Sequence, residues 1–398
     1  MAGFITSLQL DILQQIVNVN WGITGFLYCG AGGMVGSNDG ETWKKMPDGV
    51  EATSVAYAGG CWIAAGVGAY HRSTDAAKTW TSCASPGVSD ESTTINTVVV
   101  GTDQLDADGK PKVDSDGKPL PGLFAVMGFT SGATSSSAFV KISNNNADSW
   151  STAITIDTTT GPDKPIWDFA ASLSAAGGRI FFGTGRSYSS QDAEGFNVTY
   201  SDAFLYVSDG GAFSGPTLIE AGGGNTSYQT GYVGYDTSAK KYCLTVQKSI
   251  KEGPLDLMYR ISSTPSFGAG SDIFIASGAL GNPGPVAGGG GSFATGFHDD
   301  DGSGSYSVSA AMLPGGPQSL TSIPYAQALG APFQAVCYSG AKKDSTGGGK
   351  FCCSTIDGKI YAAKPAGSFK SVYSGSPLIS SDGGASAYVA AGKVTLPK

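Results

Sequence analysis

Three short stretches determine the fold: Gly36–Trp43 (GSNDGETW), Ser73–Trp80 (STDAAKTW) and Ser143–Trp150 (SNNNADSW). In each, a small polar turn stands between a β-type run and a tryptophan, and another β-type run follows the tryptophan. Asp and Asn favour such turns because their side chains accept hydrogen bonds from their own backbone, and a tryptophan can fill the space beside the sheet. The recurring unit is strand, turn, strand, and it predicts a repeat architecture.

Weaker copies of the same unit, in which phenylalanine replaces the tryptophan, continue along the chain. They lie at Tyr206–Phe213, Ile261–Phe267 and Ala363–Phe369. The last two aromatics are 102 residues apart (369 − 267), about two units, and Ser305–Leu313 followed by Pro314–Pro317 supplies the missing strand and turn. Seven units predict an all-β fold, a seven-bladed antiparallel β-propeller, although six or eight blades fit the spacing nearly as well.

The domain organisation follows from the repeat. The length of 398 residues alone suggests two or three domains, but a radial repeat holds residues 1–398 as a single domain. Residues 102–122 are predicted to form a hairpin-like insertion in the third blade. Residues 376–398 are predicted to supply strands that close the ring.

The four-strand pattern fits some blades better than others. The innermost strands of the first and fourth blades are expected at 16–20 and 167–171. The sixth blade is the least defined, because the glycine-rich segment 284–291 is nearly structureless by composition.

The three turns resemble the Asp box, Ser-x-Asp-x-Gly-x-Thr-Trp, the repeat of sialidase-like propellers that is also called the BNR repeat. The second copy matches at every position except Ala77, the first shifts its acid by one position, and the third has Asn145 where the family prefers Asp. The resemblance implies that the boxes lie on the outer rim and that their side chains serve their own turns. The residues expected in this structural role are Asn38, Asp39, Gly40, Thr42, Trp43, Ser73, Asp75, Thr79, Trp80, Ser143, Asn145, Ser149, Trp150, Ser208, Asp209, Gly210 and Phe213.

Charge and hydropathy exclude several classes of partner. The net charge is −8 and the pI is near 4.8, whereas a nucleic-acid surface needs clustered basic groups. No stretch approaches the ~18 consecutive apolar residues of a membrane span, and Met1–Ser7 lacks the basic start and apolar core of a secretion signal. We therefore expect a soluble protein with no nucleic-acid partner and no membrane span.

Seven cysteines lie in or beside strand-like runs, without the C-x-x-C spacing of a metal site. They are expected to be reduced, buried thiols, with one or more disulfides as the alternative. The neighbours Cys352 and Cys353 point to opposite faces if their segment is a strand.

Groups that could carry out catalysis are sparse. A sialidase binds a carboxylate with three arginines, but this chain has four arginines in all, and Arg72 lies in an Asp-box strand. Other Asp-box glycosidases use paired acids across a cleft, for which Asp168 and Asp236 are candidates. Two histidines and the lack of a G-x-S-x-G motif disfavour nucleophilic hydrolysis. No catalytic residue is assigned, and the candidate ligand-binding residues are Arg179, Arg186, Arg260, Trp62 and Tyr188, with Tyr228 as a further aromatic.

Two acidic segments raise the question of a bound cation. The tandem Asp106–Pro111 and Asp114–Pro119 resembles the start of a calcium loop but lacks the third acid and the distal Glu. Two Asp-Gly turns equally describe an exposed hairpin, and His298–Gly302 equally describes a solvated loop. No cofactor and no metal is expected, with Ca²⁺ at these loops as the alternative.

The scarcity of catalytic groups favours a non-enzymatic interaction propeller. By analogy, the sparse charge, the lack of a signal and the Gly/Ser-rich, irregular blades favour a bacteriophage virion component, such as a neck, tail-nozzle or fibre-associated protein. Its expected role is protein-protein assembly with other virion subunits in a homo-oligomeric complex, or attachment to a host surface. The alternatives are an extracellular, lectin-like propeller that binds a cell-surface glycan, and a sialidase-like or other Asp-box glycoside hydrolase.

Overall fold

The protein is an all-β structure built from seven antiparallel sheets. The computed structural model describes residues 23–30, 32–66, 69–87, 93–95, 98–131, 135–160, 172–191, 197–223, 226–250, 255–267, 273–279, 283–300, 306–314, 325–328, 333–340, 349–355, 358–374 and 388–396. Within these ranges the chain forms strands, turns and bends and no helix, so it contains no helix that could cross a membrane. The seven-bladed propeller expected from the repeat is confirmed.

Each sheet forms one blade, with strands that follow one another from the axis outward. Blade 1 contains β29 (Tyr388–Val394), β1 (Ile23–Gly30), β2 (Gly33–Ser37) and β3 (Lys44–Lys45), and blade 2 contains β4 (Ser54–Ala58), β5 (Cys61–Gly66), β6 (Ala69–Ser73) and β7 (Thr81–Ser82). In blade 3, β8 (Thr93–Ile95) and β9 (Val100–Thr102) both pair with β10 (Leu123–Ser131), which is followed by β11 (Ser135–Ser143) and β12 (Ile154–Thr160). Blade 4 contains β13 (Ser172–Ala176), β14 (Arg179–Gln191), β15 (Asn197–Ser208) and β16 (Ser214–Glu220). Blade 5 contains β17 (Thr226–Asp236), β18 (Lys241–Ile250), β19 (Leu255–Ser262) and β20 (Ile273–Ala279). Blade 6 contains β21 (Pro283–Gly289), β22 (Ser292–Asp300), β23 (Tyr306–Pro314) and β24 (Tyr325–Ala328). Blade 7 contains β25 (Phe333–Ser339), β26 (Lys350–Thr355), β27 (Lys359–Ala363) and β28 (Lys370–Ser374).

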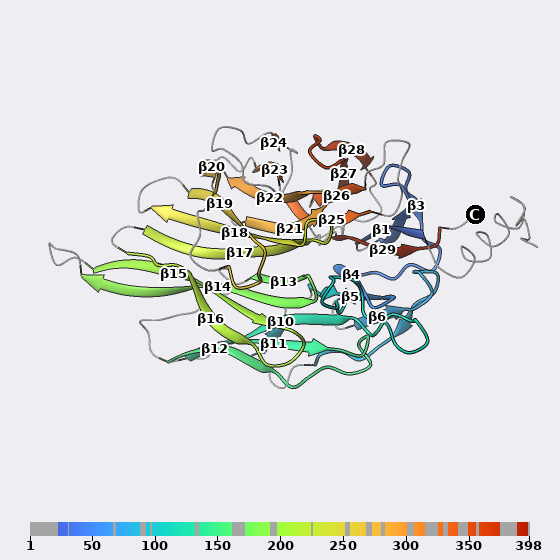
Figure 1. Ribbon diagram of the computed structural model, residues 1–398, viewed down its shortest axis with the longest axis horizontal. Coiled ribbons are helices and arrows are strands. Elements are labelled where there is room, and N and C mark those ends of the chain that lie inside the picture. The colour runs from blue at the N-terminus through green and yellow to red at the C-terminus, as the bar shows by residue number, and fades with distance from the viewer. Residues whose placement is uncertain are drawn as a thin grey trace, which may run out of the picture.

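Blade 1 combines the two ends of the described chain. Its inner strand β29 pairs antiparallel with β1, from Ile23↔Val394 to Cys29↔Tyr388, and Figure 1 shows the red β29 beside the blue β1. The segment 16–20, expected as this inner strand, lies outside the described residues, and β29 holds the position instead. The innermost strands then adjoin one another in the ring order β29, β4, β9, β13, β17, β21, β25 and back to β29.

The inner strands are poor in large side chains because they converge at the axis. A Cβ atom on Gly288 of β21 would come within 2.6 Å of the backbone of Tyr235 in blade 5. Only glycine fits such a close approach. The expectation that 284–291 is nearly structureless is therefore wrong, because residues 284–289 belong to the inner strand of blade 6 and Gly290 and Gly291 form the turn that follows it. In blade 4 the inner strand is β13, and the expected 167–171 lies outside the described residues.

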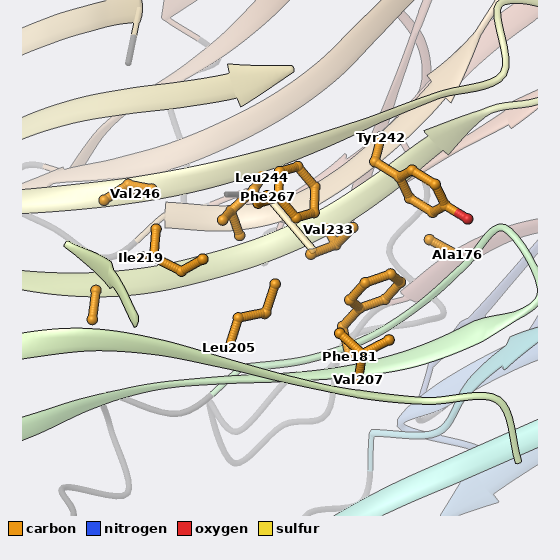
Figure 2. Packing of buried hydrophobic residues seen from close by; sticks show 11 residues of the cluster. Ala176, Phe181, Leu205, Val207, Ile219, Val233, Tyr242, Leu244, Val246 and Phe267 are labelled. Carbon is orange, nitrogen blue, oxygen red and sulfur yellow. The ribbon is translucent and has the colours of Figure 1, made fainter. Parts of the chain in front are cut away.

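Buried apolar side chains gather between the blades. Among the described residues they form seven clusters, one for each pair of neighbouring blades. Figure 2 shows the cluster between blades 4 and 5, where Phe181 and Leu205 face Val233 and Leu244. Full burial of one such side chain contributes roughly 1.5–3 kcal/mol, so packing between blades holds the ring together.

All seven cysteines are free thiols. Burial raises the pKa of Cys61 to about 12, so this thiol stays protonated near neutral pH and behaves as a small apolar group. Cys352 and Cys353 are neighbours in β26 but belong to different interfaces, Cys352 facing blade 1 and Cys353 facing blade 6. This is the alternation expected of a strand.

Candidate functional site

Side-chain hydrogen bonds within the turn hold the second copy of the repeat. The hydroxyl of Ser73 donates to Asp75 (2.8 Å) and accepts from the N–H of Ala77 (3.0 Å). The Asp75 carboxylate accepts from the N–H and the hydroxyl of Thr79, at 3.0 and 2.7 Å. Burial alone would raise the pKa of Asp75, but these hydrogen bonds, with those from Ser73 and the N–H of Lys78, hold it below its usual value.

The first copy is a shortened form of the same turn. Ser37 donates to Asp39 (3.0 Å) and accepts from the N–H of Gly40 (2.8 Å), three residues later instead of four. Asp39 also accepts from the N–H of Thr42 (2.7 Å). The acid therefore lies two residues after the serine, as in the second copy. The first copy is one residue shorter between its acid and its tryptophan, in the tip of the turn after Asn38 and Asp39.

The third copy replaces the acid by an amide. Ser143 donates to Asn145 (2.9 Å) and accepts from the N–H of Ala147 (2.9 Å). The Asn145 amide donates to the hydroxyl of Ser149 (2.8 Å), which reverses the direction of the corresponding bond in the second copy. In this turn, therefore, a neutral amide takes the place of the carboxylate.

The fourth copy, Ser208–Phe213, departs from the others. Ser208 donates to the carbonyl of Gly211 (2.7 Å) and accepts from the N–H of Gly210 (3.1 Å). Asp209 is exposed, and no hydrogen bond to its carboxylate comes from the described residues. This aspartate, expected to serve the turn, instead lines a groove beside it.

The aromatic residue that ends each copy packs against the preceding blade. Trp43 lies 6.2 Å from Tyr373 of blade 7, and Trp150 lies 5.9 Å from Tyr70 of blade 2, measured between ring centroids. The same position is taken between blades 1 and 2 by Trp80 and between blades 3 and 4 by Phe213. Each ring fills the space between two blades.

The axis of the propeller holds a cavity of about 330 Å³ to which all seven inner strands contribute. We call it the axial cavity. Small and apolar residues make up most of its wall, with Tyr57, Tyr235 and Tyr338 among the larger ones. Among the described residues that line it, Asp103 is the one carboxylate. Glycosidases use two carboxylates that flank the scissile bond, so the described wall does not supply a catalytic pair.

Polar groups beside the axial cavity connect neighbouring blades. Asp103 of blade 3 accepts from the N–H of Gly59 in blade 2 (2.6 Å). Thr102 accepts from the N–H of Gly178 in blade 4 (3.1 Å). These side chains therefore satisfy backbone donors of the adjoining turns, which is a structural use.

Asp236 is part of the same kind of connection. It is fully buried in blade 5 and accepts from the N–H of Gly291 in blade 6 (2.7 Å). It also accepts from the N–H and the hydroxyl of Ser238 in its own turn, at 2.8 and 2.6 Å. A carboxylate with these partners and no access to solvent does not act on a substrate. Asp168, the other acid of the pair considered from the sequence, lies outside the described residues.

The arginines whose side chains the structure describes do not converge into a clamp. Arg260 is 3% exposed, pairs with Glu220 of blade 4 and donates to two backbone carbonyls at 3.4 Å. Arg72 pairs with Asp148 of blade 3. Arg186 belongs to β14, where its backbone is paired with Asp202 of β15. Arg260 and Arg72 thus connect neighbouring blades, and neither lines the axial cavity.

The candidate aromatics have different places. Trp62 is fully buried with its ring 4.9 Å from that of Tyr57, so it has no exposed face on which a sugar could stack. Tyr228 is partly buried against the cluster between blades 4 and 5. Tyr188 lies in β14, with its backbone paired with Tyr200 of β15.

The insertion of blade 3 forms one wall of a groove of about 510 Å³, and turns of blades 4 and 5 form the other. We call it the insertion groove. It shares Leu105, Gly177 and Tyr235 with the wall of the axial cavity, so the two openings are neighbours. Its volume lies within the range of ligand sites, roughly 300–1,000 Å³. The residues that give it polar or aromatic character are Gln104, Asp106, Lys112, Arg179, Asp209, Tyr235, Lys240, Tyr242, Ser263 and Thr264.

Arg179 and two tyrosines form a connected unit in the insertion groove. Arg179 begins β14, and its side chain lies near enough to Tyr242 to lower the pKa of that hydroxyl. The ring of Tyr242 lies 4.6 Å from that of Tyr235, and its hydroxyl donates to the carbonyl of Gly177 (3.3 Å). Burial raises the pKa of both tyrosines, although Arg179 lowers that of Tyr242. Both hydroxyls therefore stay protonated at neutral pH.

Two consecutive hairpin turns shape the insertion, and in each an aspartate accepts from two backbone N–H groups. The acceptor and its donors are Asp106 with Asp108 and Lys110, and Asp114 with Asp116 and Lys118, all at 2.9 Å. The first turn reaches blade 5, because a Cβ on Gly109 would lie 3.4 Å from the Tyr235 hydroxyl. In the part of the chain that the structure describes, no three His, Cys, Asp or Glu side chains gather to hold a metal. Ca²⁺ at these loops stays a prediction.

The insertion groove is a site that the sequence only partly indicates. Arg179 is a candidate from the sequence, but Tyr235 and Tyr242 read as parts of strands and Lys112 and Lys240 as ordinary exposed residues. The groove forms where the insertion folds across two later blades, a contact between segments far apart in the chain. The available signal is that an insertion interrupts a regular repeat, since added loops often carry function.

Comparisons with known proteins show no family for this chain. No protein-family model matches the chain, and no curated protein matches it. Solved structures that resemble it include an α-L-arabinofuranosidase from Fusarium graminearum, with 12% identity, 94% of each chain covered and a TM-score of 0.44. A Trypanosoma rangeli sialidase is 9% identical over 67% of this chain and 51% of the sialidase, with a TM-score of 0.36. An Aleuria aurantia lectin in complex with α-methyl-L-fucoside is 11% identical over 75% of this chain and 99% of the lectin, with a TM-score of 0.37.

The expectation of a bacteriophage virion component is overturned by these comparisons. The solved structures named above are glycosidases and a lectin, and none of these is a virion protein. The glycine-rich composition that suggested a virion component has a cause in the fold, because inner strands such as β21 approach their neighbours too closely for a Cβ. Such composition follows from the propeller and does not indicate a virus particle.

Proposed function

We propose that this chain is a saccharide-binding propeller of the Asp-box type and that the insertion groove is its binding site. The Ser-Asp and Ser-Asn hydrogen bonds of the second and third turns support the Asp-box assignment. The observation that carries the proposed function is that the groove brings Arg179, Asp209 and the Tyr235–Tyr242 pair together from different turns.

The lining of the insertion groove suits a sugar. Sugar hydroxyls both donate and accept hydrogen bonds, so a saccharide site needs acceptors and donors close together. Asp106 and Asp209 supply carboxylate acceptors, while Arg179, Gln104 and the lysines supply donors. Tyr235 adds an aromatic surface with a polar end, which can contact the apolar face of a sugar ring. We propose binding without catalysis, because one oxygen of the Asp106 carboxylate, Oδ1, is already occupied by hydrogen bonds from two backbone N–H groups.

Two aspartate variants test the site. Asp209→Ala removes a carboxylate of the blade 4 turn that lines the groove, whereas Asp108→Ala removes an exposed carboxylate of the insertion that does not line it. In calorimetric titrations with a panel of oligosaccharides, we expect Asp209→Ala to weaken binding about tenfold. Asp108→Ala should bind like the parent protein. Equal binding by all three proteins, or no binding of any saccharide at millimolar concentration, would contradict the proposal.

A further inference from the structure

The insertion groove has a positive character in an acidic protein. The whole chain carries a net charge of −8. The described groove lining, however, contains three cations, Arg179, Lys112 and Lys240, against the two carboxylates Asp106 and Asp209. Local charge of the opposite sign to the protein as a whole favours an anionic ligand at that place.

Arg179 differs from the other arginines whose side chains are described. Arg72 and Arg260 each have a carboxylate partner, Asp148 and Glu220. Within the described ranges no carboxylate pairs with Arg179, which is partly buried and lies near the Tyr242 hydroxyl. A guanidinium has five N–H donors, so most of them remain for a ligand. Removing a cation from water without an anion is unfavourable, and an anionic ligand would offset that cost.

The backbone of Arg179 and the neighbouring Tyr242 are both held in place. As the first residue of β14 it is paired with Ala176 of β13, directly after the Gly177-Gly178 turn. Its neighbour Tyr242 is also held in place, because the tyrosine hydroxyl donates to the Gly177 carbonyl (3.3 Å). A guanidinium on a paired strand, beside a tyrosine that is itself held, can present two N–H groups to a planar, two-oxygen anion.

We infer that the insertion groove selects saccharides that carry a carboxylate, namely uronic-acid units, and that Arg179 binds the carboxylate. The inference rests on the proposed saccharide-binding function. Lys112 and Lys240 are exposed at the groove and attract the anion at longer range, while Arg179 makes the direct contact. The site is distinct from the axial cavity, whose described lining contains no arginine or lysine.

The test compares three ligands that share a size but differ in charge. The probes are a galacturonate trimer, its full methyl ester and a neutral hexose trimer, each titrated into the full chain at neutral pH. We expect the acid to bind about tenfold more tightly than the ester, and this preference to weaken as salt concentration rises. The hexose trimer with sulfate groups added should not reproduce the preference, because the geometry of the guanidinium suits a planar carboxylate.

Charge-removing variants place the effect on Arg179. Arg179→Gln should lower affinity for the acid to that for the ester and leave affinity for the ester unchanged. Lys78→Gln, which removes one exposed cation from a blade 2 turn outside the groove, should change neither. If Arg179→Gln does not fold, Lys240→Gln provides a second test, since it should reduce the acid preference and its salt dependence.

The outcomes separate the inference from the proposed function. Equal binding of acid and ester, with Asp209→Ala still weakening both, overturns the carboxylate preference and leaves saccharide binding standing. Equal preference for carboxylate and sulfate overturns the assignment of a carboxylate site. A failure to bind any of the trimers or the wider oligosaccharide panel overturns both proposals.

Discussion

The axial cavity and the insertion groove are neighbouring openings whose polar groups have different uses. At the axial cavity, Asp103 and Thr102 accept from backbone N–H groups of adjoining blades, and Asp236 does the same one turn away. In the insertion groove, Arg179 and Asp209 have no ionic partner among the described residues. The first set of groups connects neighbouring blades, and the second set belongs to the groove for which we propose a ligand.

The comparison predicts its largest effect at a turn beside the axial cavity. A Cβ on Gly59 would come within 2.0 Å of the backbone nitrogen of Gly122, and Gly59 has a φ of 57°. We expect Gly59→Ala to lower the free energy of unfolding by about 3 kcal/mol or more, measured by chemical denaturation. Gly60→Ala is the matched control, since Gly60 has a φ of 76° but nothing within 4 Å of an added Cβ. It should cost about 1 kcal/mol, and equal losses would show that the close approach at Gly59 is unimportant.

A second prediction contrasts Arg260, which has a carboxylate partner, with Arg179, which has none among the described residues. Arg260→Met leaves Glu220 without its partner in a site where the arginine is 3% exposed, and should lower the free energy of unfolding by about 2 kcal/mol. Arg179→Met removes a cation without a described carboxylate partner and should cost less than about 0.5 kcal/mol. Urea unfolding of both variants measures the difference. A larger loss for Arg179→Met would mean that this residue supports the fold instead of a ligand.

The smallest effect is expected at the second box turn, and it depends on pH. The pKa of Asp75 in the folded protein is below its usual value, because hydrogen bonds to the carboxylate outweigh the effect of burial. Its contribution to stability is therefore present above about pH 4, the unfolded value, and is lost as pH falls through the lower folded value.

The variant Asp75→Asn checks this pH dependence. It should lower the free energy of unfolding at pH 7 by less than about 0.5 kcal/mol, because Asn145 holds the third turn with an amide in the same place. The gap between variant and parent should close as the pH falls from about 4 towards 2. Urea unfolding at several pH values measures it, and a gap that widens in acid would reverse the sign of the argument.

Much of the fold could be predicted from the sequence because its main signal is local. Trp43, Trp80 and Trp150 each follow their turn within a few residues, and the number of units gives the number of blades. The inner strand of blade 6 could not be recognised in the same way. Its glycines look like a loop until the strand is seen against Tyr235 of the neighbouring blade, where a side chain would not fit.

The candidate site was harder to predict because it depends on contacts between distant segments. The sequence makes Arg179 a candidate, but it also suggests Arg260 and Trp62, and both of these are buried. Burial and pairing, which decide whether such a side chain can reach a ligand, arise only when blades pack together. Asp209 shows the same limit, since a box-like sequence assigns it to a turn and the structure places it at the insertion groove.

The pairing of β29 with β1 has a consequence for how the protein is made. Blade 1 takes its inner strand from residues 388–394 and its second strand from residues 23–30. During synthesis, therefore, β1 emerges before residues 31–387 and must wait for all of them before its inner neighbour β29 exists, with one side of its backbone unpaired in the meantime. The circle is completed by the last described strand, and until then the nascent chain is an open arc.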